Sequence, residues 1–216
     1  KEDYRVLQIR ALMAQGKHEE ALQVTNEALE KVSRGVRVRL AAEKVFRHNG
    51  DSKRADAVLA EINQLAGTRP WAYRNAPDLV ALGRTALKLG GEPKLVLDNL
   101  FAEARKRDAD YPGVSLAIGE LALSKSDFAL AGRTFQLALK KGPRSAVLHF
   151  GAARAFAPSD RMAMLEHLDA GVGAVVSKLK QEELFDNTLL FFLTDNGGSK
   201  AMQADNGSLR GFKGSL

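Results

Sequence analysis

Residues 16–29 read Gly16-Lys17-His18-Glu19-Glu20-Ala21-Leu22-Gln23-Val24-Thr25-Asn26-Glu27-Ala28-Leu29. A turn residue is followed five positions later by a small residue, and then by apolar residues at helical spacing. The turn and the small residue return at Gly50 and Ala55, in each case after 34 positions, and the pattern is clear again at Ser126 and Ala131. A period near 34 with small residues where two helices meet predicts a mainly α fold of stacked helical hairpins.

Turn and capping residues predict where the helices of this solenoid begin and end. We expect helices over 3–15, 18–31, 36–49, 52–66, 78–89, 93–107, 113–124, 127–141 and 144–156. Residues 67–77 interrupt the series, because Pro70 and Pro77 lack the amide hydrogen that a helix needs. We expect Trp71 in this connection to fill a gap between neighbouring hairpins, and the alternative is a binding aromatic on a loop.

The composition is that of a globular chain with many helix-forming residues. Of 216 residues, 45% are hydrophobic, 27% are charged and only 6% are aromatic. No apolar run approaches the length of a membrane-spanning helix, so we expect no membrane span. The chain has no cysteine, which excludes disulfides, thiolate metal sites and a cysteine nucleophile within it.

Charge changes along the chain where the repeats end. Residues 1–157 carry 26 Lys and Arg against 18 Asp and Glu, whereas residues 158–216 carry 6 against 8. We therefore predict two domains, with a helical repeat domain over 1–157 and a different segment over 158–216. The basic excess is compatible with an acidic partner, but it lacks the interleaved aromatics of a nucleic-acid-binding surface, so no nucleic-acid partner is expected.

The repeat pattern resembles the tetratricopeptide repeat (TPR) family over about residues 2–156. Ala21, Ala55 and Ala131 stand at the small position of that family, and Pro143 stands where its second helix usually ends. The third unit departs from the pattern because Val96 replaces Ala. The resemblance implies a concave face, lined by the first helix of each hairpin, that binds a peptide or protein partner.

Basic residues at helical spacing are candidates for that peptide-binding groove. Arg37, Lys44 and His48 share one face of a predicted helix, and Arg10 lies 34 positions before Lys44. Equivalent positions in successive repeats lie side by side in a solenoid. The four residues are therefore candidate contacts for an acidic peptide, whose carboxylate the basic side chains would hold.

The last quarter of the chain has a different pattern. Residues 161–183 have the apolar period of a helix, in which Gly171 and Gly173 suggest the close approach of another backbone. We interpret His167 in this helix as a surface histidine. The run Thr188–Thr194 is continuously apolar and predicts a strand buried on both faces, as in a parallel sheet.

Residues 164–216 resemble part of the sulfatase family, in the alkaline-phosphatase-like superfamily. The resemblance is carried by the stretches 164–173, Asp186-Asn187-Thr188 through Thr194-Asp195-Asn196-Gly197-Gly198, and Asn206-Gly207-Ser208-Leu209-Arg210-Gly211-Phe212-Lys213-Gly214. It implies a partial α/β segment in which Asp195 and Asn196 are ligands of a divalent cation, usually calcium. It also implies that Lys213 contacts a sulfate group.

The family nucleophile is absent from this segment. No Cys or Ser stands in a Cys/Ser-x-Pro-x-Arg motif, and no early pair of metal-binding aspartates is present. We therefore expect a protein-interaction scaffold with a truncated, non-catalytic sulfatase-like segment. The alternative is part of a calcium-dependent sulfuric ester hydrolase whose nucleophile lies outside this chain. A natural fusion, a fragment of a larger enzyme and an artificial join of two coding sequences all account for the two parts, and we favour the last.

Overall fold

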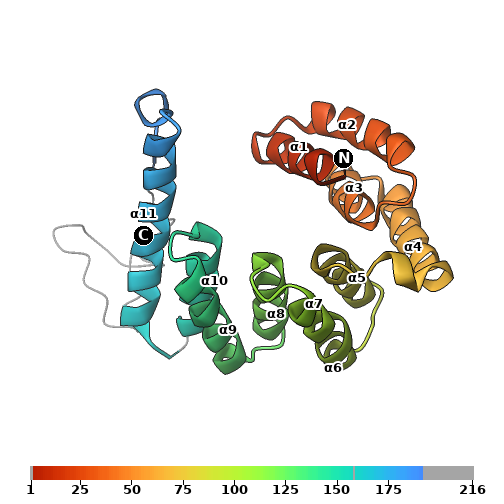
Figure 1. Cartoon of the computed structure of the whole chain (residues 1–216). Helices are drawn as coiled ribbons and strands as arrows, with labels where there is room; N and C mark the ends of the chain where they lie inside the picture. Colours follow the sequence, from red (N-terminus) through yellow and green to blue (C-terminus); the bar gives the residue numbers. More distant parts are fainter. Residues whose placement is uncertain (1, 158, 192–216) are drawn as a thin grey trace, which may run out of the picture. The chain divides into compact units, whose positions relative to one another are not determined.

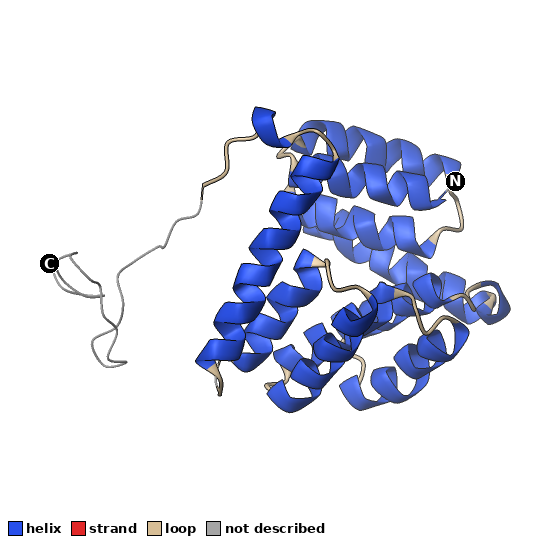
Figure 2. Cartoon of the chain, turned by 60° about the vertical axis from the view of Figure 1, so that its left-hand side comes forward, coloured by secondary structure: helices blue, strands red, loops and turns tan. Residues whose placement is uncertain are grey.

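The computed structural model describes residues 2–157 and 159–191, and within these ranges every regular element is helical (Figures 1 and 2). The chain divides into two compact units, Lys1–Ala174 and Val175–Leu216. The first unit therefore contains the repeats together with residues 161–174, the first part of the last long helix. The boundary predicted after residue 157 remains a sequence-based division.

The helices follow one another as hairpins, and the two arms of each of the first four hairpins contact each other. The first arms are α1 (Glu2–Ala14), α3 (Val36–His48), α5 (Ala76–Lys88), α8 (Pro112–Ser124) and α10 (Ala146–Phe156). The second arms are α2 (His18–Lys31), α4 (Ser52–Thr68), the continuous segment α6 (Pro93–Leu95), η2 (Val96–Phe101) and α7 (Ala102–Arg107), then α9 (Phe128–Lys141) and α11 (Arg161–Gln181). Short 3₁₀ turns cover Pro70–Ala72 and Phe185–Asn187. The hairpin solenoid predicted from the 34-residue period is therefore the observed architecture.

Local chemistry sets the turns between the arms. Gly16 and Gly50 take left-handed backbone conformations, with φ of 71° and 76°, which a residue without Cβ adopts at little cost. Asp51 then accepts a hydrogen bond from the Arg54 amide, 3.0 Å away, and caps α4. Asp127 caps α9 in the same way, through the amide of Leu130 at 2.9 Å. These features confirm the turn positions expected from the sequence.

The core consists of small residues packed against large ones. The three alanines at the small position of the repeat, Ala21, Ala55 and Ala131, are fully buried. The largest fully buried side chains include Phe46, Phe101 and Phe135. Because each hairpin buries its apolar face against the next hairpin, the core runs as a series of adjoining clusters along the stack.

Glycines inside first arms let phenyl rings approach the helix backbone. A Cβ added to Gly119 in α8 would lie 2.6 Å from Cε1 of Phe135, and one added to Gly151 in α10 would lie 2.5 Å from the same atom. The ring of Phe135 therefore occupies space that a methyl group would need on both neighbouring helices. Gly83 in α5 has the same relation to Phe101.

The connection after α4 is held by a different aromatic residue from the one expected. Trp71 is 64% exposed, so the prediction that it fills a gap between hairpins was wrong. Tyr73 is buried instead, at 6% exposure, and its hydroxyl donates a hydrogen bond to the Arg34 carbonyl at 3.0 Å. A phenol can bury its ring and satisfy its hydroxyl at a backbone carbonyl, which makes it the better fit at this position.

The strand predicted over 188–194 is not formed in its described part. Thr188–Phe191 has no regular structure, and Leu189 and Phe191 are 79% and 73% exposed. A strand that is buried on both faces needs hydrogen-bonded neighbours in a sheet, and residues 2–157 and 159–191 contain none. The α/β segment is therefore absent from this part of the chain. Residues 192–194 lie outside the described residues.

Replacement of Gly119 by Ala should lower the free energy of unfolding by about 1–2 kcal/mol, because the new methyl group meets the buried ring of Phe135. Higher helix propensity, worth about 1 kcal/mol, opposes this loss. The matched control is Gly67→Ala in α4, where nothing lies within 4 Å of the added Cβ, so stability should hold or rise. Urea unfolding followed by circular dichroism measures both variants, and equal midpoints would show that the ring moves aside freely.

Candidate functional site

Each of the five first arms carries one charged residue at the same position along its helix. These residues, which we call the charged row, are Arg10, Lys44, Arg84, Glu120 and Arg154. Successive members are 34, 40, 36 and 34 positions apart, and the arms that carry them contact one another in the order α1, α3, α5, α8, α10. The longer second step reflects the connection over residues 67–77.

The middle of the row is crowded with positive charge. Partial burial lowers the pKa of the Lys44 ammonium, and the cations of Arg84 and Arg10 lower it further, while Glu120 opposes them. Arg84 itself pairs with Glu120 at 2.7 Å. Within the described part of the chain, neither Arg10 nor Lys44 forms an ion pair. Arg10 and Lys44 are therefore available to form ion pairs with a bound anion.

A hollow of about 430 Å³ adjoins the row between α5 and α8. Arg84 and Glu120 line it together with Leu87, Leu121 and the turn at Gly90–Gly91. Apolar side chains beside an ion pair can take both the apolar and the charged parts of a peptide. The charged row thus borders a depression at Arg84 and Glu120.

Arg37, a predicted groove residue, is engaged within the protein. Its Nε lies 2.7 Å from Oδ1 of Asp78, its Nη2 lies 3.1 Å from Oε2 of Glu2, and its Nη1 pairs with Asp3. Partial burial lowers the pKa of Arg37, but the carboxylates of Glu2, Asp78 and Asp3 outweigh it and raise the pKa overall. One guanidinium thus joins α1, α3 and α5.

The carboxylate of Glu2 also caps the N-terminus of α3. Its Oε1 accepts the backbone N–H groups of Arg37 and Val38, each at 2.9 Å. These are amides of the first turn of α3, whose preceding residue, Gly35, has no side chain with which to cap it. A residue of the first hairpin therefore caps the first helix of the second.

His48, the fourth predicted groove residue, lies beside another histidine. Its ring centroid is 3.9 Å from that of His18, the first residue of α2, with the rings tilted by 33°. The Nδ1 atom of His18 is buried and has no hydrogen-bond partner among the described residues. Of the four candidates, the structure thus places Arg10 and Lys44 in the charged row, Arg37 in an ion network and His48 in a histidine pair.

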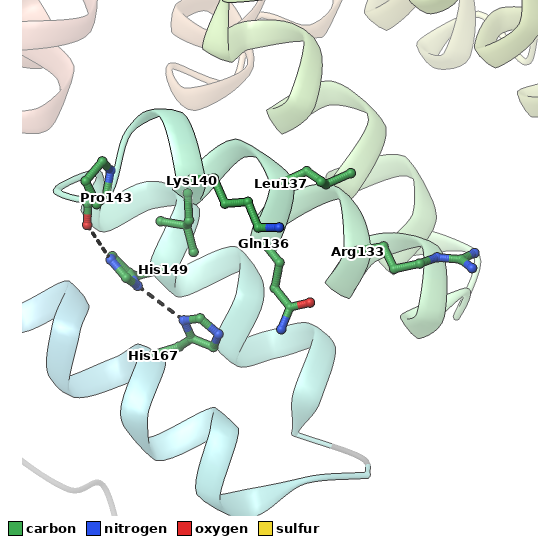
Figure 3. Close-up of a pocket in the computed structure, with 8 residues that line it drawn as sticks. Arg133, Gln136, Leu137, Lys140, Pro143, His149 and His167 are labelled. Atoms are coloured by element: carbon green, nitrogen blue, oxygen red, sulfur yellow. Dashed lines mark hydrogen bonds between the residues drawn. The ribbon is translucent and has the colours of Figure 1, made fainter.

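A second histidine pair joins α10 to the first part of α11 (Figure 3). His149 Nε2 lies 2.8 Å from the Pro143 carbonyl, and His149 Nδ1 lies 3.2 Å from His167 Nδ1. The ring of Phe156 stacks on His167, with centroids 5.5 Å apart and planes within 10°. His167 is therefore half-buried in an interhelical contact, and its interpretation as a surface histidine was wrong.

Glycine allows this contact to be close. A Cβ on Gly171 would lie 3.3 Å from the His149 Cβ and 3.7 Å from the Ala146 carbonyl oxygen, which confirms the close approach expected at Gly171. Nothing lies within 4 Å of Gly173, where the same expectation was wrong.

The predicted metal and sulfate ligands cannot be placed. Asp195, Asn196 and Lys213 lie outside the described residues. In the ranges that the structure does describe, no group of three or more His, Asp or Glu side chains could hold a metal ion. No described helix is both long enough and apolar enough to cross a membrane.

Comparison with solved structures finds the same arrangement of helices in other proteins. PilW, a widely conserved type IV pilus biogenesis factor, matches 83% of this chain and 78% of its own, with 15% identity and a TM-score of 0.53. Cut9, in the APC/C hetero-tetramer Cut9–Hcn1, matches 86% of this chain over 36% of its own, with 15% identity and a TM-score of 0.55. The chain has a TPR-like helical repeat fold.

A weaker similarity is found to YrrB, a TPR protein with an unusual peptide-binding site, at 20% identity over 81% of this chain and 90% of that one. Its TM-score of 0.44 is too low to add to the fold assignment. No family model matches the sequence.

Sequence reasoning missed the three members of the charged row that follow Lys44. Arg84, Glu120 and Arg154 were not found, because the step from Lys44 to Arg84 is 40 positions and a fixed 34-residue period does not reach Arg84. The signal was present in the connection over 67–77, whose extra length displaces every later repeat by about six positions.

Removal of the Arg37 charge should destabilise the stack by about 3 kcal/mol, because the side chain of Asp78 is only 8% exposed and would be left without its counter-ion. Arg37→Met keeps the aliphatic stem and removes the guanidinium. The control is Lys31→Met, which breaks only an exposed pair with Glu27 and should change stability by less than about 1 kcal/mol. Thermal and urea unfolding test both, and similar small losses would refute a stabilising role for the network.

Docking of α11 on α10 should weaken as the pH falls. Burial lowers the pKa of His167, and the nearby His149 lowers it further, while Glu166 opposes them. The docked state therefore binds fewer protons than the undocked state, so stability is present above about pH 6.5 and is lost progressively below it. Amide hydrogen exchange of residues 164–174, corrected for intrinsic rates, should quicken between about pH 7 and pH 5.

The amides of α4 serve as the internal reference for that experiment, because this helix is remote in sequence from the histidine pair. Equal protection of residues 164–174 at both pH values would contradict the proposed proton dependence.

Proposed function

We propose that the chain is a protein-interaction scaffold that holds an acidic peptide segment along its charged row. The observation that carries this proposal is the setting of Lys44, an exposed residue that lies near the cations of Arg10, Arg84 and Lys88 and forms no ion pair with the described residues. A carboxylate placed beside Lys44 would relieve this repulsion. Since Arg10 and Lys44 form no ion pair with the described residues, a partner carboxylate has nothing to displace there.

The spacing of the row matches an extended peptide. Neighbouring packed helices lie about 8–10 Å apart, and an extended chain advances about 3.3 Å per residue. Carboxylates three residues apart would therefore reach Arg10 and Lys44 together. Arg84 is paired with Glu120 and would add only to the positive potential around the peptide. The hollow beside Arg84 offers apolar surface to the peptide residues between the carboxylates.

The other two predicted groove residues fit supporting roles. We propose that Arg37 fixes the relative positions of α1, α3 and α5, because its guanidinium is engaged by carboxylates from two of these helices. His48 would border the groove at the end of α3, beside His18. Neither role requires direct contact with the peptide.

One structural relative with this fold is seen in complex with another protein. Cut9 is seen with Hcn1 in a hetero-tetramer, and PilW is a pilus biogenesis factor. At 15% identity these similarities are an analogy at the level of the fold. The choice of an acidic partner rests on the charges of this chain alone.

A sulfuric ester hydrolase remains the alternative from the sequence. It rests on the resemblance of residues 164–216, with Asp195 and Asn196 as calcium ligands and Lys213 at the sulfate. The chain contains no cysteine for the family nucleophile, so a sulfate ester would be a substrate only with residues supplied from elsewhere. The first part of the resembling stretch, around His167, packs against α10 as the second arm of the last hairpin.

A direct test uses a fluorescently labelled nonapeptide with Glu at positions 1, 4 and 7 in a Ser-Gly background, and the same peptide with Gln in place of Glu. Fluorescence anisotropy should show binding of the Glu peptide that weakens with salt, because exposed ion pairs are screened. Arg10→Glu with Lys44→Glu should weaken binding about tenfold or more, from two lost pairs of up to about 1 kcal/mol each and the added repulsion.

The control variant Lys53→Glu with Lys94→Glu makes the same change in net charge at two other exposed positions. Equal losses in the two variants, or equal affinity for the Glu and Gln peptides, would overturn the assignment of the charged row.

A further inference from the structure

A separate hollow of about 640 Å³ lies among α9, the turn after it, α10 and the first part of α11 (Figure 3). All of its lining residues belong to the first compact unit. Its apolar surface comes from Leu137, Leu139 and Pro143. Leu137 is 61% exposed, so α9 presents a large apolar side chain to this hollow with little covering it.

The polar lining of the hollow is entirely basic or neutral. Arg133 and Lys140 project from α9 and are exposed, and in the ranges 2–157 and 159–191 neither forms an ion pair. Gln136 and the two histidines, His149 and His167, complete it. Because no lining residue carries a carboxylate, the hollow offers an anion favourable charge without a competing internal partner.

The hydrogen bonds of the histidine pair assign a proton to each ring. The Pro143 carbonyl can only accept, so His149 Nε2 carries the hydrogen that points at it. In its neutral form, His149 then accepts at Nδ1, and His167 must donate from its own Nδ1. His167 Nε2 is the remaining nitrogen of the pair, free to take a proton without breaking either hydrogen bond.

From these features, we propose that the hollow between α9, α10 and α11 binds a small carboxylate with an apolar body, such as an aliphatic or aromatic acid. Its volume falls in the range of small-molecule sites, about 300–1,000 Å³. Arg133 and Lys140 would hold the carboxylate, and the apolar body would cover Leu137 and Pro143. This site is distinct from the charged row, which lies on the first arms.

Binding at this site is coupled to protonation of the histidine pair. The charged groups that act on His167 are His149 on α10 and Glu166 on α11, while Arg133 and Lys140 on α9 line the same hollow. Burial and the neighbouring His149 disfavour an added proton on His167, and a carboxylate bound in the hollow offsets both. The bound state therefore takes up a proton more readily than the free state, and affinity rises as the pH falls below the ordinary value of about 6.5.

Three probes separate the contributions of charge and apolar surface. Octanoate carries both, acetate carries the charge alone, and octan-1-ol carries the chain alone. Isothermal titration of the full chain at pH 8 and pH 6 should show saturable octanoate binding, at least tenfold tighter than either of the other two and tighter at pH 6. Histidine side-chain NMR should show that octanoate shifts the His167 resonances.

Charge-reversal variants and a His167 variant test whether octanoate binds in this hollow. Arg133→Glu with Lys140→Glu should weaken octanoate binding about tenfold, as expected for two exposed charge contacts reversed together. Lys53→Glu with Arg105→Glu changes the net charge equally at other exposed positions and should leave it unchanged. His167→Gln keeps a side-chain N–H for His149 and should preserve binding at pH 8 while reducing the gain at pH 6.

Equal affinity for octanoate and octan-1-ol would remove the role of the cations, and equal affinity for octanoate and acetate would remove that of the apolar surface. Undiminished binding in the Arg133/Lys140 variant, with circular dichroism unchanged, would place the ligand elsewhere. Any of these three results overturns the proposal.

Discussion

The stack depends on how closely its helices can approach. Phe101 and Phe135 fill the space between arms because Gly83, Gly119 and Gly151 leave room for their rings. Each ring buries a large apolar area, and each glycine gives up helix propensity to admit it. Since a hairpin of this kind cannot bury its apolar face alone, stability resides in these interfaces rather than in single helices. The placement of every surface side chain, and hence of any binding face, follows from them.

Much of the fold could be predicted from local sequence because its determinants are local. A turn glycine, a capping residue and a small residue at fixed spacing define each hairpin, and these are visible without knowledge of neighbours. Predictions failed where a distant partner decides the outcome. Tyr73 is buried in place of Trp71 because its hydroxyl reaches the Arg34 carbonyl, 39 positions earlier. A strand over 188–194 was predicted from its composition, but strands also need partners, and none is present in its described surroundings.

The candidate binding surfaces, too, could be predicted only where their residues are related by the regular repeat. Arg10 and Lys44 could be paired from the sequence because they are one repeat apart, whereas Arg84 lies beyond an irregular connection. His167 carried no signal at all, since its contacts depend on the packing of α11 against α10. The two candidate surfaces thus use different parts of the solenoid. The charged row recurs from one first arm to the next. The hollow lies at a single place, where α11 packs against α10.

The capping of α3 by Glu2 has a consequence for how this chain can be divided. In an ideal repeat array each unit supplies its own helix ends, so terminal units can be removed or exchanged like modules. Here the first turn of α3 takes its hydrogen-bond acceptor from α1, and Gly35 leaves space for that carboxylate. Cutting before α3 would expose the amides of its first turn and leave Arg37 with only Asp78. The first two hairpins therefore form one unit of exchange, and shuffling of repeats in engineered arrays would have to keep them together.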